Sequence, residues 1–236
     1  MDKKTKSILN FGRVASLIIG CGYLVIGVLM IFDPAERYRG DEYLNQFYLH
    51  PFIPLTWRSI FVLVAFLTIM WITATDKMVR NKSDECEGIY SWIKILGYAS
   101  AVISAIQWYK ELYQWHYLEN YMERPEYYRT LIPIIGTGID PDYIWMFGAL
   151  GIWYLFTSVL AGKHKVFGRA MMIFGVLSGV ALLLTMFFAI TDILIYFPNG
   201  NQMAVMQFTS LMGGVCGAIY HLIGFKEVGK VLKSKV

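Results

Sequence analysis

The chain has 236 residues, of which 56% are hydrophobic and only 16% are charged. An ordinary soluble domain carries roughly 25% charged residues, so this composition argues against a soluble globular protein. The net charge of +4 comes from basic residues spread over short separate segments, without the interleaved aromatic residues of a nucleic-acid surface. The composition therefore predicts an integral membrane protein whose main partner is the lipid bilayer, and it argues against binding of nucleic acid.

Six apolar segments of the chain are long enough to cross a bilayer. A helix rises about 1.5 Å per residue and needs about 20 apolar residues to cross a hydrocarbon core of about 30 Å. The predicted spans are, in chain order, 14–32, 59–75, 89–109, 143–162, 170–191 and 203–225. The sequence thus predicts an all-α fold, a polytopic helical bundle that forms a single integral membrane domain over residues 1–236.

The first span has an alternative interpretation as a cleaved secretory signal, because it follows a lysine-rich start. Two features oppose it. The uncharged run Val14–Phe32 is longer than the apolar core of a signal peptide, and Asp33-Pro34-Ala35-Glu36 offers no cleavage site of small residues. We expect a retained first helix.

The third, fifth and sixth spans have distinctive borders. Lys94 lies within two turns of the start of the third span, from where its ammonium can reach the headgroups. The residues after that span contain no helix breaker before Pro125, so the third helix is expected to project beyond the membrane or bend along it. The turn formers in 197–201 predict a tight hairpin between the last two spans.

Lysine and arginine are distributed unevenly between the two sides of the predicted bundle. Of 21 such residues, 15 fall in the N-terminal segment, the second and fourth connections and the C-terminal tail. Positive flanks are retained in the cytoplasm, so both termini are predicted to be cytoplasmic. The predicted outer loops 33–58 and 110–142 are rich in tyrosine and tryptophan instead. Such residues anchor a protein at the interface, and a ligand or partner surface is the alternative.

The polar residues of the spans lean toward the outer half. Counting along the helices puts Asp192 near the outer surface and His221 near the inner one, which leaves no ionisable group near the midplane. The candidates for an outer ligand-binding vestibule are Arg58, Gln107, Asp192 and Gln207. A guanidinium paired with a carboxylate there could orient a polar headgroup or a small solute. The alternative is that these groups are solvated at helix ends.

No sequence motif indicates catalysis or a cofactor. The four histidines lack the spacing of a zinc site, and the nucleophile and phosphate-binding motifs are absent. The three cysteines show no paired spacing. No catalytic residue, metal or cofactor is predicted, and His221 is expected to hydrogen-bond a neighbouring helix. A site built from His50, His116 and the outer carboxylates is the enzymatic alternative.

Small residues recur at four-residue spacing in three spans, as Ser100 and Ser104, Gly175 and Gly179, and Gly213 and Gly217. Such faces let helices approach closely in lipid. We expect them to serve packing within the bundle, with the fifth and sixth helices against each other, and oligomerisation is the alternative.

The functional prediction is a non-enzymatic membrane protein, either a subunit or accessory of a membrane assembly or a binder of a small or lipidic molecule at its outer face. A small oligomeric channel or uniporter and an intramembrane enzyme with an outer-face site are the alternatives. Expected partners are other membrane subunits or further copies of the chain. The default location is a bacterial inner (plasma) membrane, because long targeting or glycosylated regions are missing.

Overall fold

The computed structural model describes residues 2–35, 40–80, 87–123, 140, 144–194 and 201–234. Its helices are α1 (Lys3–Phe32), α2 (Gly40–Leu49), α3 (Phe52–Arg80), α4 (Glu87–Glu123), the π-helical turn η2 (Ile144–Ala149), α6 (Leu150–Lys163), α7 (Arg169–Leu194) and α8 (Asn201–Ser234). Most of the predicted outer loop 110–142 and of the predicted turn 197–201 lies outside the described residues.

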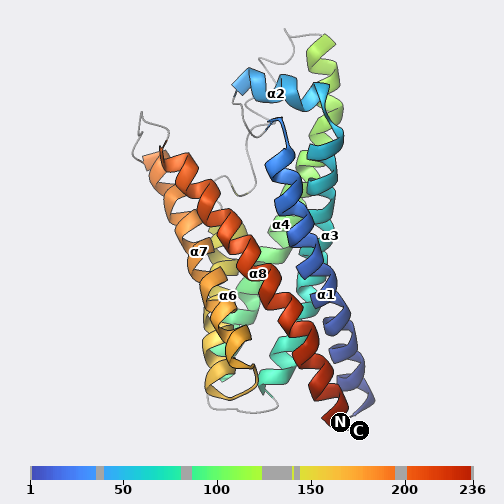
Figure 1. Cartoon of the computed structure of the whole chain (residues 1–236), viewed down its shortest axis with the longest axis vertical. Coiled ribbons are helices and arrows are strands. Elements are labelled where there is room, and N and C mark those ends of the chain that lie inside the picture. The colour runs from blue at the N-terminus through green and yellow to red at the C-terminus, as the bar shows by residue number, and fades with distance from the viewer. Residues whose placement is uncertain are drawn as a thin grey trace.

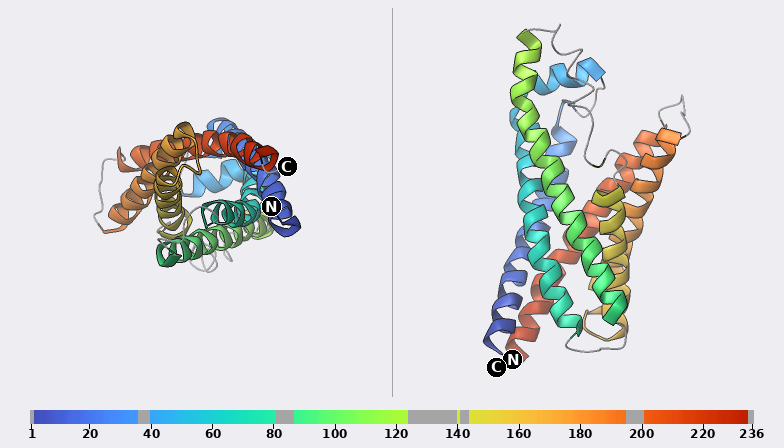
Figure 2. Two further views of the ribbon diagram at one scale, coloured as in Figure 1. Left: turned by 90° about the horizontal axis from the view of Figure 1, so that it is seen from below. Right: turned by 180° about the vertical axis from the view of Figure 1, so that it is seen from behind.

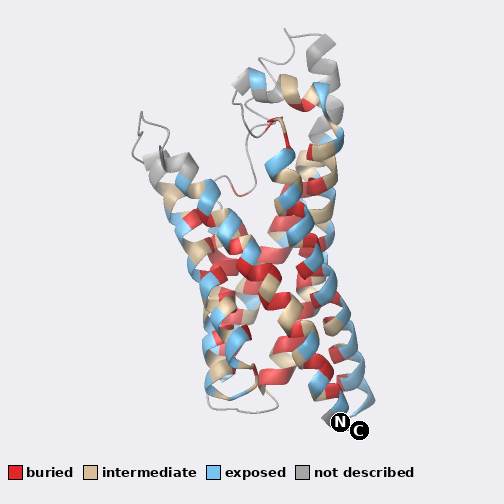
Figure 3. Cartoon of the chain, viewed as in Figure 1, coloured by how far each residue is buried: buried red, intermediate tan, exposed pale blue. Residues whose placement is uncertain are grey.

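Within the described part of the chain, six helices are long and apolar enough to cross a membrane. They are Lys3–Phe32, Phe52–Arg80, Glu87–Tyr113, Ile144–Lys163, Arg169–Ile190 and Val205–Lys233, so each predicted span is confirmed. Buried residues face the inside of the bundle, whereas many large apolar side chains lie on its outside (Figure 3). Apolar side chains on the outside of a bundle of such long apolar helices are typical of a surface that faces lipid, which is the arrangement of a membrane protein.

Several helices extend past the apolar segments that predict them. α1 begins at Lys3, capped by Asp2, whose Oδ1 accepts from the backbone N–H of Thr5 at 2.5 Å; this hydrogen bond lowers the pKa of Asp2 below its ordinary value. α4 continues to Glu123, as the lack of a breaker predicts, and α8 continues to Ser234. An apolar run marks only the part of a helix that lies in hydrocarbon, because the backbone bonds of a helix continue equally well in water.

The segment 33–58 is not the loop that the sequence suggests. It contains α2, and α3 begins at Phe52, seven residues before the predicted span. Pro54 is tolerated there because it stands in the first turn of α3, where its missing N–H has no partner to lose. For α2 the error arises because hydropathy detects apolar runs and misses helical turns in polar sequence; for the start of α3 it arises because Arg58 interrupts the apolar run.

The six spans pack as a closed ring. α1 contacts α3, α3 contacts α4, α4 contacts η2 and α6, α6 contacts α7, α7 contacts α8, and α8 returns to α1 (Figure 2, left). The start of α1 and the end of α8 lie at the same end of the bundle, here called the terminal end. At the opposite end, the far end, α7 and α8 diverge from α1, α3 and α4 (Figures 1 and 2).

Small residues bring neighbouring spans together inside the ring. A Cβ added at Gly179 of α7 would lie 2.7 Å from the Gly151 carbonyl oxygen of α6, so only glycine allows that approach. The predicted packing of the last two spans is confirmed, because Ser178 Oγ donates to the Gly213 carbonyl at 2.9 Å and Thr185 Oγ1 donates to Thr209 Oγ1 at 2.9 Å. The small-residue faces of α7 and α8 thus serve contacts within the bundle.

An ion-pair network joins α3 to α4 at the terminal end. Asp76 accepts from Arg80 Nε and from Lys94 Nζ, each at 2.8 Å. Arg80 also pairs with Glu87 and donates through Nη2 to Ser91 Oγ at 2.9 Å. Lys94 is therefore neutralised by a neighbouring helix, where the sequence offers only the headgroups as its partner.

Candidate functional site

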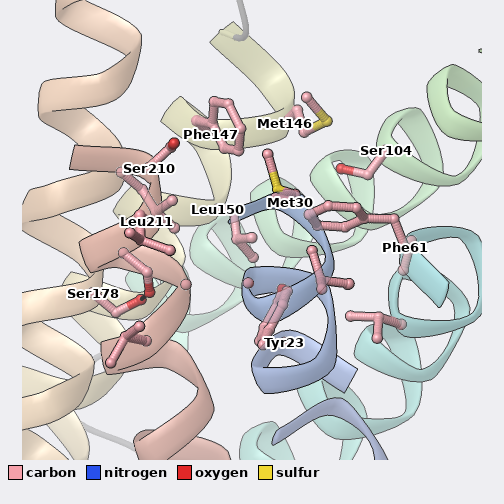
Figure 4. Close-up of a pocket in the computed structure, with 18 of the residues that line it drawn as sticks. Tyr23, Met30, Phe61, Ser104, Met146, Phe147, Leu150, Ser178, Ser210 and Leu211 are labelled. Atoms are coloured by element: carbon pink, nitrogen blue, oxygen red, sulfur yellow. Dashed lines mark hydrogen bonds between the residues drawn. The ribbon is translucent and has the colours of Figure 1, made fainter. Parts of the chain in front are cut away.

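A central cavity of about 350 Å³ lies in the far half of the bundle. Every span contributes to its wall. Figure 4 shows Tyr23 of α1, Phe61 of α3, Ser104 of α4, Leu150 of α6, Ser178 of α7 and Leu211 of α8 around it. Such a volume is within the range of small-molecule pockets and holds on the order of a dozen non-hydrogen atoms, at about 30 Å³ for each water-sized group.

The cavity wall is apolar in character although it contains hydroxyl groups. Its larger side chains include Ile26, Val64, Leu150 and Leu182, which are buried aliphatic residues. Several wall hydroxyls donate to backbone carbonyls: Thr68 Oγ1 to Val64 at 2.8 Å, Ser178 Oγ to Gly213 at 2.9 Å and Ser210 Oγ to Gln207 at 2.9 Å. With their protons engaged, these groups add acceptors but few donors, so the wall suits a molecule with a hydrocarbon body.

Tyr154 forms the polar floor of the cavity. Its hydroxyl lies 2.6 Å from Nε2 of His221, which is fully buried. Ser16 Oγ donates its proton to the backbone carbonyl of His221 at 2.7 Å. The Nδ1 atom of the His221 ring lies 3.4 Å from the same Ser16 Oγ. Because the Ser16 proton is engaged, Nδ1 is the donor in the second contact, and Nε2 is left to accept from Tyr154. The expected hydrogen bond of His221 to a neighbouring helix is confirmed. His221 contacts two helices in this way, α1 through Ser16 and α6 through Tyr154.

His221 lies deeper than counting along the sequence predicts. Its partner Tyr154 stands ten residues after Ile144 and nine before Lys163, the ends of the fourth span. The imidazole is therefore level with the middle of that span instead of its inner end. The count fails because α8 continues well past residue 225, so the apolar run does not locate the helix along the bundle axis.

A layer of buried aromatic side chains closes the bundle below the floor. Trp71, Trp153 and Tyr220 each expose 2% or less of their surface. Trp71 meets Tyr220 edge-on with ring centroids 6.1 Å apart, and it meets His221 at 5.5 Å. Arg13 lies nearer the terminal end, with its guanidinium 4.3 Å from the Phe225 ring centroid. The cavity therefore ends above a packed aromatic layer.

The rim of the cavity at the far end is built around Asp33. This residue follows α1, is almost fully buried, and lines the cavity. Trp57 Nε1 donates to its Oδ2 at 2.7 Å, and the backbone N–H of Ala35 donates to its Oδ1 at 2.9 Å. Trp108 stacks on Phe61 at 4.6 Å and meets Trp57 edge-on at 5.3 Å. The carboxylate and these three rings form a rigid rim.

Arg58 and Gln107 meet behind this rim, through a residue that the sequence does not single out. Arg58 Nε donates to Glu111 Oε2 at 2.9 Å, and Gln107 Nε2 donates to Glu111 Oε1 at 3.2 Å. The Arg58 guanidinium also lies 3.9 Å from the Trp57 ring centroid and donates through Nη1 to the Pro54 carbonyl at 3.2 Å. The expected pairing of a guanidinium with a carboxylate is present, with Glu111 as the acid.

The predicted vestibule residues thus occupy different places. Gln207 is exposed and lines the cavity. Arg58 and Gln107 support the rim from behind and are absent from the cavity wall. The side chain of Asp192 lies outside the described residues. Sequence reasoning missed Tyr23 and Tyr154, because both are uncharged residues within apolar runs. Their one signal in the sequence is a phenol hydroxyl in the interior of a span, where it needs a hydrogen-bond partner.

Among the described residues, no three histidine, cysteine, aspartate or glutamate side chains gather in a way that could hold a metal ion. The part of the chain that the structure describes is an all-α bundle of six apolar helices around a central cavity in its far half. No family model, curated protein or solved structure matches this chain.

Proposed function

We propose that the protein binds a small, largely apolar molecule in its central cavity, as a non-enzymatic protein of the membrane. The observation that carries this proposal is the cavity itself, which draws its wall from every span and combines buried aliphatic residues with a few fixed polar groups at the floor and rim. That combination is the usual chemistry of a ligand pocket.

The distribution of basic residues supports an orientation with both termini in the cytoplasm and the far end outside. The cavity then belongs to the outer half of the bilayer. The buried aromatic layer around Trp71 and Tyr220 supports binding over passage through a single copy of the chain, because a channel needs a polar path to the terminal end.

The test fills the cavity without disturbing the fold. Gly214 lines the cavity, and a Cβ added there meets no atom within 4 Å, so Gly214→Phe places a ring in the empty volume. Gly88 provides the matched control. It stands in the first turn of α4, is exposed, also has nothing within 4 Å of an added Cβ, and does not line the cavity.

Native mass spectrometry of protein gently extracted from its own membrane should show a retained small molecule on the wild type and on Gly88→Phe, and none on Gly214→Phe. Bromoundecanol serves as a defined ligand, because its bromine quenches the fluorescence of a tryptophan that it touches, and Trp108 lies in the wall. We expect saturable quenching that Gly214→Phe abolishes. Equal quenching in all three proteins would mean that the ligand merely dissolves around the bundle, and the proposal would fail. A stoichiometric protein partner in the same spectra would instead support the accessory-subunit function.

A further inference from the structure

The cavity wall is exposed on one side only. Among the described residues that line it, those with exposed side chains are Ile31 of α1 and Gln207, Leu211 and Val215 of α8. Ile31 exposes 59% of its surface, Leu211 38% and Val215 39%. The remaining lining residues are buried or half-buried. The outer halves of α1 and α8 therefore form the open side of the cavity, which we call the α1–α8 seam (residues 27–31 and 207–215).

The seam is loose compared with the other contacts of α1. In the terminal half, a Cβ added at Gly20 would lie 2.9 Å from Leu222 Cγ of α8, and one added at Gly22 would lie 2.7 Å from Val64 Cγ2 of α3. At the seam, a Cβ at Gly27 meets one atom within 4 Å, Leu211 Cδ1 at 3.7 Å. The seam is thus bridged by the tip of a leucine side chain, which can change rotamer without moving either backbone.

The outside of the seam is apolar on both helices. Leu24 and Val28 of α1 and Phe208 and Met212 of α8 are all exposed there. Apart from Gln207 at the far end of the seam, a molecule that approaches Leu211 from the hydrocarbon of the bilayer meets apolar side chains on both helices.

The wall also limits the chemistry of the occupant. Asp33 is the only acidic or basic side chain among the described lining residues, and both of its oxygens already accept hydrogen bonds. An anionic headgroup would meet this carboxylate without a basic lining residue to balance it. Gln207 and Ser210 at the start of α8 leave polar atoms for an uncharged headgroup, and the volume suits one chain of about a dozen heavy atoms.

We propose that the occupant is a neutral single-chain amphiphile of the membrane that enters sideways from the bilayer through the α1–α8 seam, with Leu211 resting on Gly27 as the gate. This inference rests on the proposed binding function and adds the class of ligand and its route. Entry from the water at the far end is the competing route.

The experiment closes the seam by a reversible bridge. Gly27→Cys and Leu211→Cys are introduced into a chain whose three native cysteines are replaced by serine, and a short reagent with two methanethiosulfonate groups joins them. Bromoundecanol is then delivered from phosphatidylcholine vesicles to the protein in nanodiscs, and tryptophan quenching is followed in time. We expect the bridge to slow uptake by at least about tenfold and reduction to restore it.

Two controls separate the bridge from its side effects. A monofunctional methanethiosulfonate adds the same bulk to both cysteines without joining the helices, and uptake should stay fast. A second bridge, between Arg13→Cys and Gly229→Cys, joins α1 to α8 below the cavity, because a Cβ at Gly229 lies 3.2 Å from Arg13 Nε. This bridge should leave the rate unchanged.

The outcomes distinguish the inference from the function on which it rests. Saturable quenching at an unchanged rate in the bridged seam would show entry from water and overturn the lateral route while binding stands. Preferential binding of undecanoate over the alcohol would overturn the neutral class. Absence of saturable quenching in the unbridged protein would remove the proposed function and the inference together.

Discussion

The pair formed by Arg58 and Glu111 allows a direct test of whether the rim is a supporting structure or a solvated surface. Arg58→Met removes the guanidinium but keeps an unbranched apolar side chain, so the change is mainly electrostatic. The Arg58 side chain is 5% exposed and that of Glu111 is 25% exposed. Removing one member leaves the other with a charge that water reaches poorly.

The structure sets the expected size of the effect. Breaking a fully buried ion pair costs about 3–5 kcal/mol, and because Glu111 regains some water we halve this to about 2 kcal/mol. The lost hydrogen bond to the Pro54 carbonyl adds about 1 kcal/mol. Arg58→Met should therefore lower the free energy of unfolding by about 2–3 kcal/mol, and Glu111→Gln by about 2 kcal/mol. The double variant should show a coupling energy of at least about 1 kcal/mol.

Titration of the protein from mild detergent micelles into sodium dodecyl sulfate, followed by tryptophan fluorescence, measures these free energies. Each variant is compared with the wild type at the same detergent composition. Single variants within about 0.5 kcal/mol of the wild type and a coupling near zero would refute the reasoning, and would assign Arg58 to the solvated helix end that the sequence left as an alternative. Quenching by bromoundecanol should persist in Arg58→Met under folding conditions, because Arg58 does not line the cavity.

The other predictions concern packing, the buried histidine, the terminal end and orientation. Tyr154→Phe should cost about 1 kcal/mol in the same titration, because interhelical hydrogen bonds in membranes contribute about that much, and a second change of His221 to Phe should add less than it does alone. Gly179→Leu should prevent assembly of α6 on α7, seen as loss of monodisperse protein in size-exclusion chromatography, whereas Gly214→Leu should elute as the wild type. Asp76→Asn should destabilise by about 1–2 kcal/mol, because Lys94 and Arg80 lose their shared acceptor; an unchanged midpoint would indicate that water replaces it. Cys86 should react with an impermeant maleimide only after the cytoplasmic face is opened, and labelling of intact cells would reverse the proposed orientation.

The spans could be predicted from sequence because hydropathy and helix length are constrained by the bilayer alone. α2 could not, because its polar turns carry no apolar run. The start of α3 could not, because Arg58 interrupts the apolar run there; in the structure this guanidinium lies over the rings of Phe47 and Trp57. The same limit applies to His221, whose depth depends on how far α8 slides along α1 and not on its own residue count.

Of the candidate site, the sequence predicted one lining residue, Gln207, and two residues that support the rim, Arg58 and Gln107. Arg58 and Gln107 are conspicuous in sequence because they are polar near helix ends, yet they act through Glu111, which lies one helical turn beyond Gln107. The cavity is an absence of side chains, and Gly214 of α8 contributes to it because a Cβ added there would meet no atom within 4 Å, whereas the neighbouring Gly213 packs against Leu182 of α7. Glycine spacing indicates close packing, and the sequence cannot show which glycine lacks a neighbour.

The course of α8 has a mechanical consequence. It is one uninterrupted helix of 34 residues that is held near His221 by Ser16 and Tyr154. At about 1.5 Å per residue, Leu211 lies about 15 Å on one side of this pivot and Lys233 about 18 Å on the other. A tilt that swings Leu211 away from α1 by a given distance moves Lys233 in the opposite direction by about 1.2 times as much. If α8 tilts about this point when the proposed gate opens, its basic end at Lys233 therefore moves as well, on the other side of the pivot.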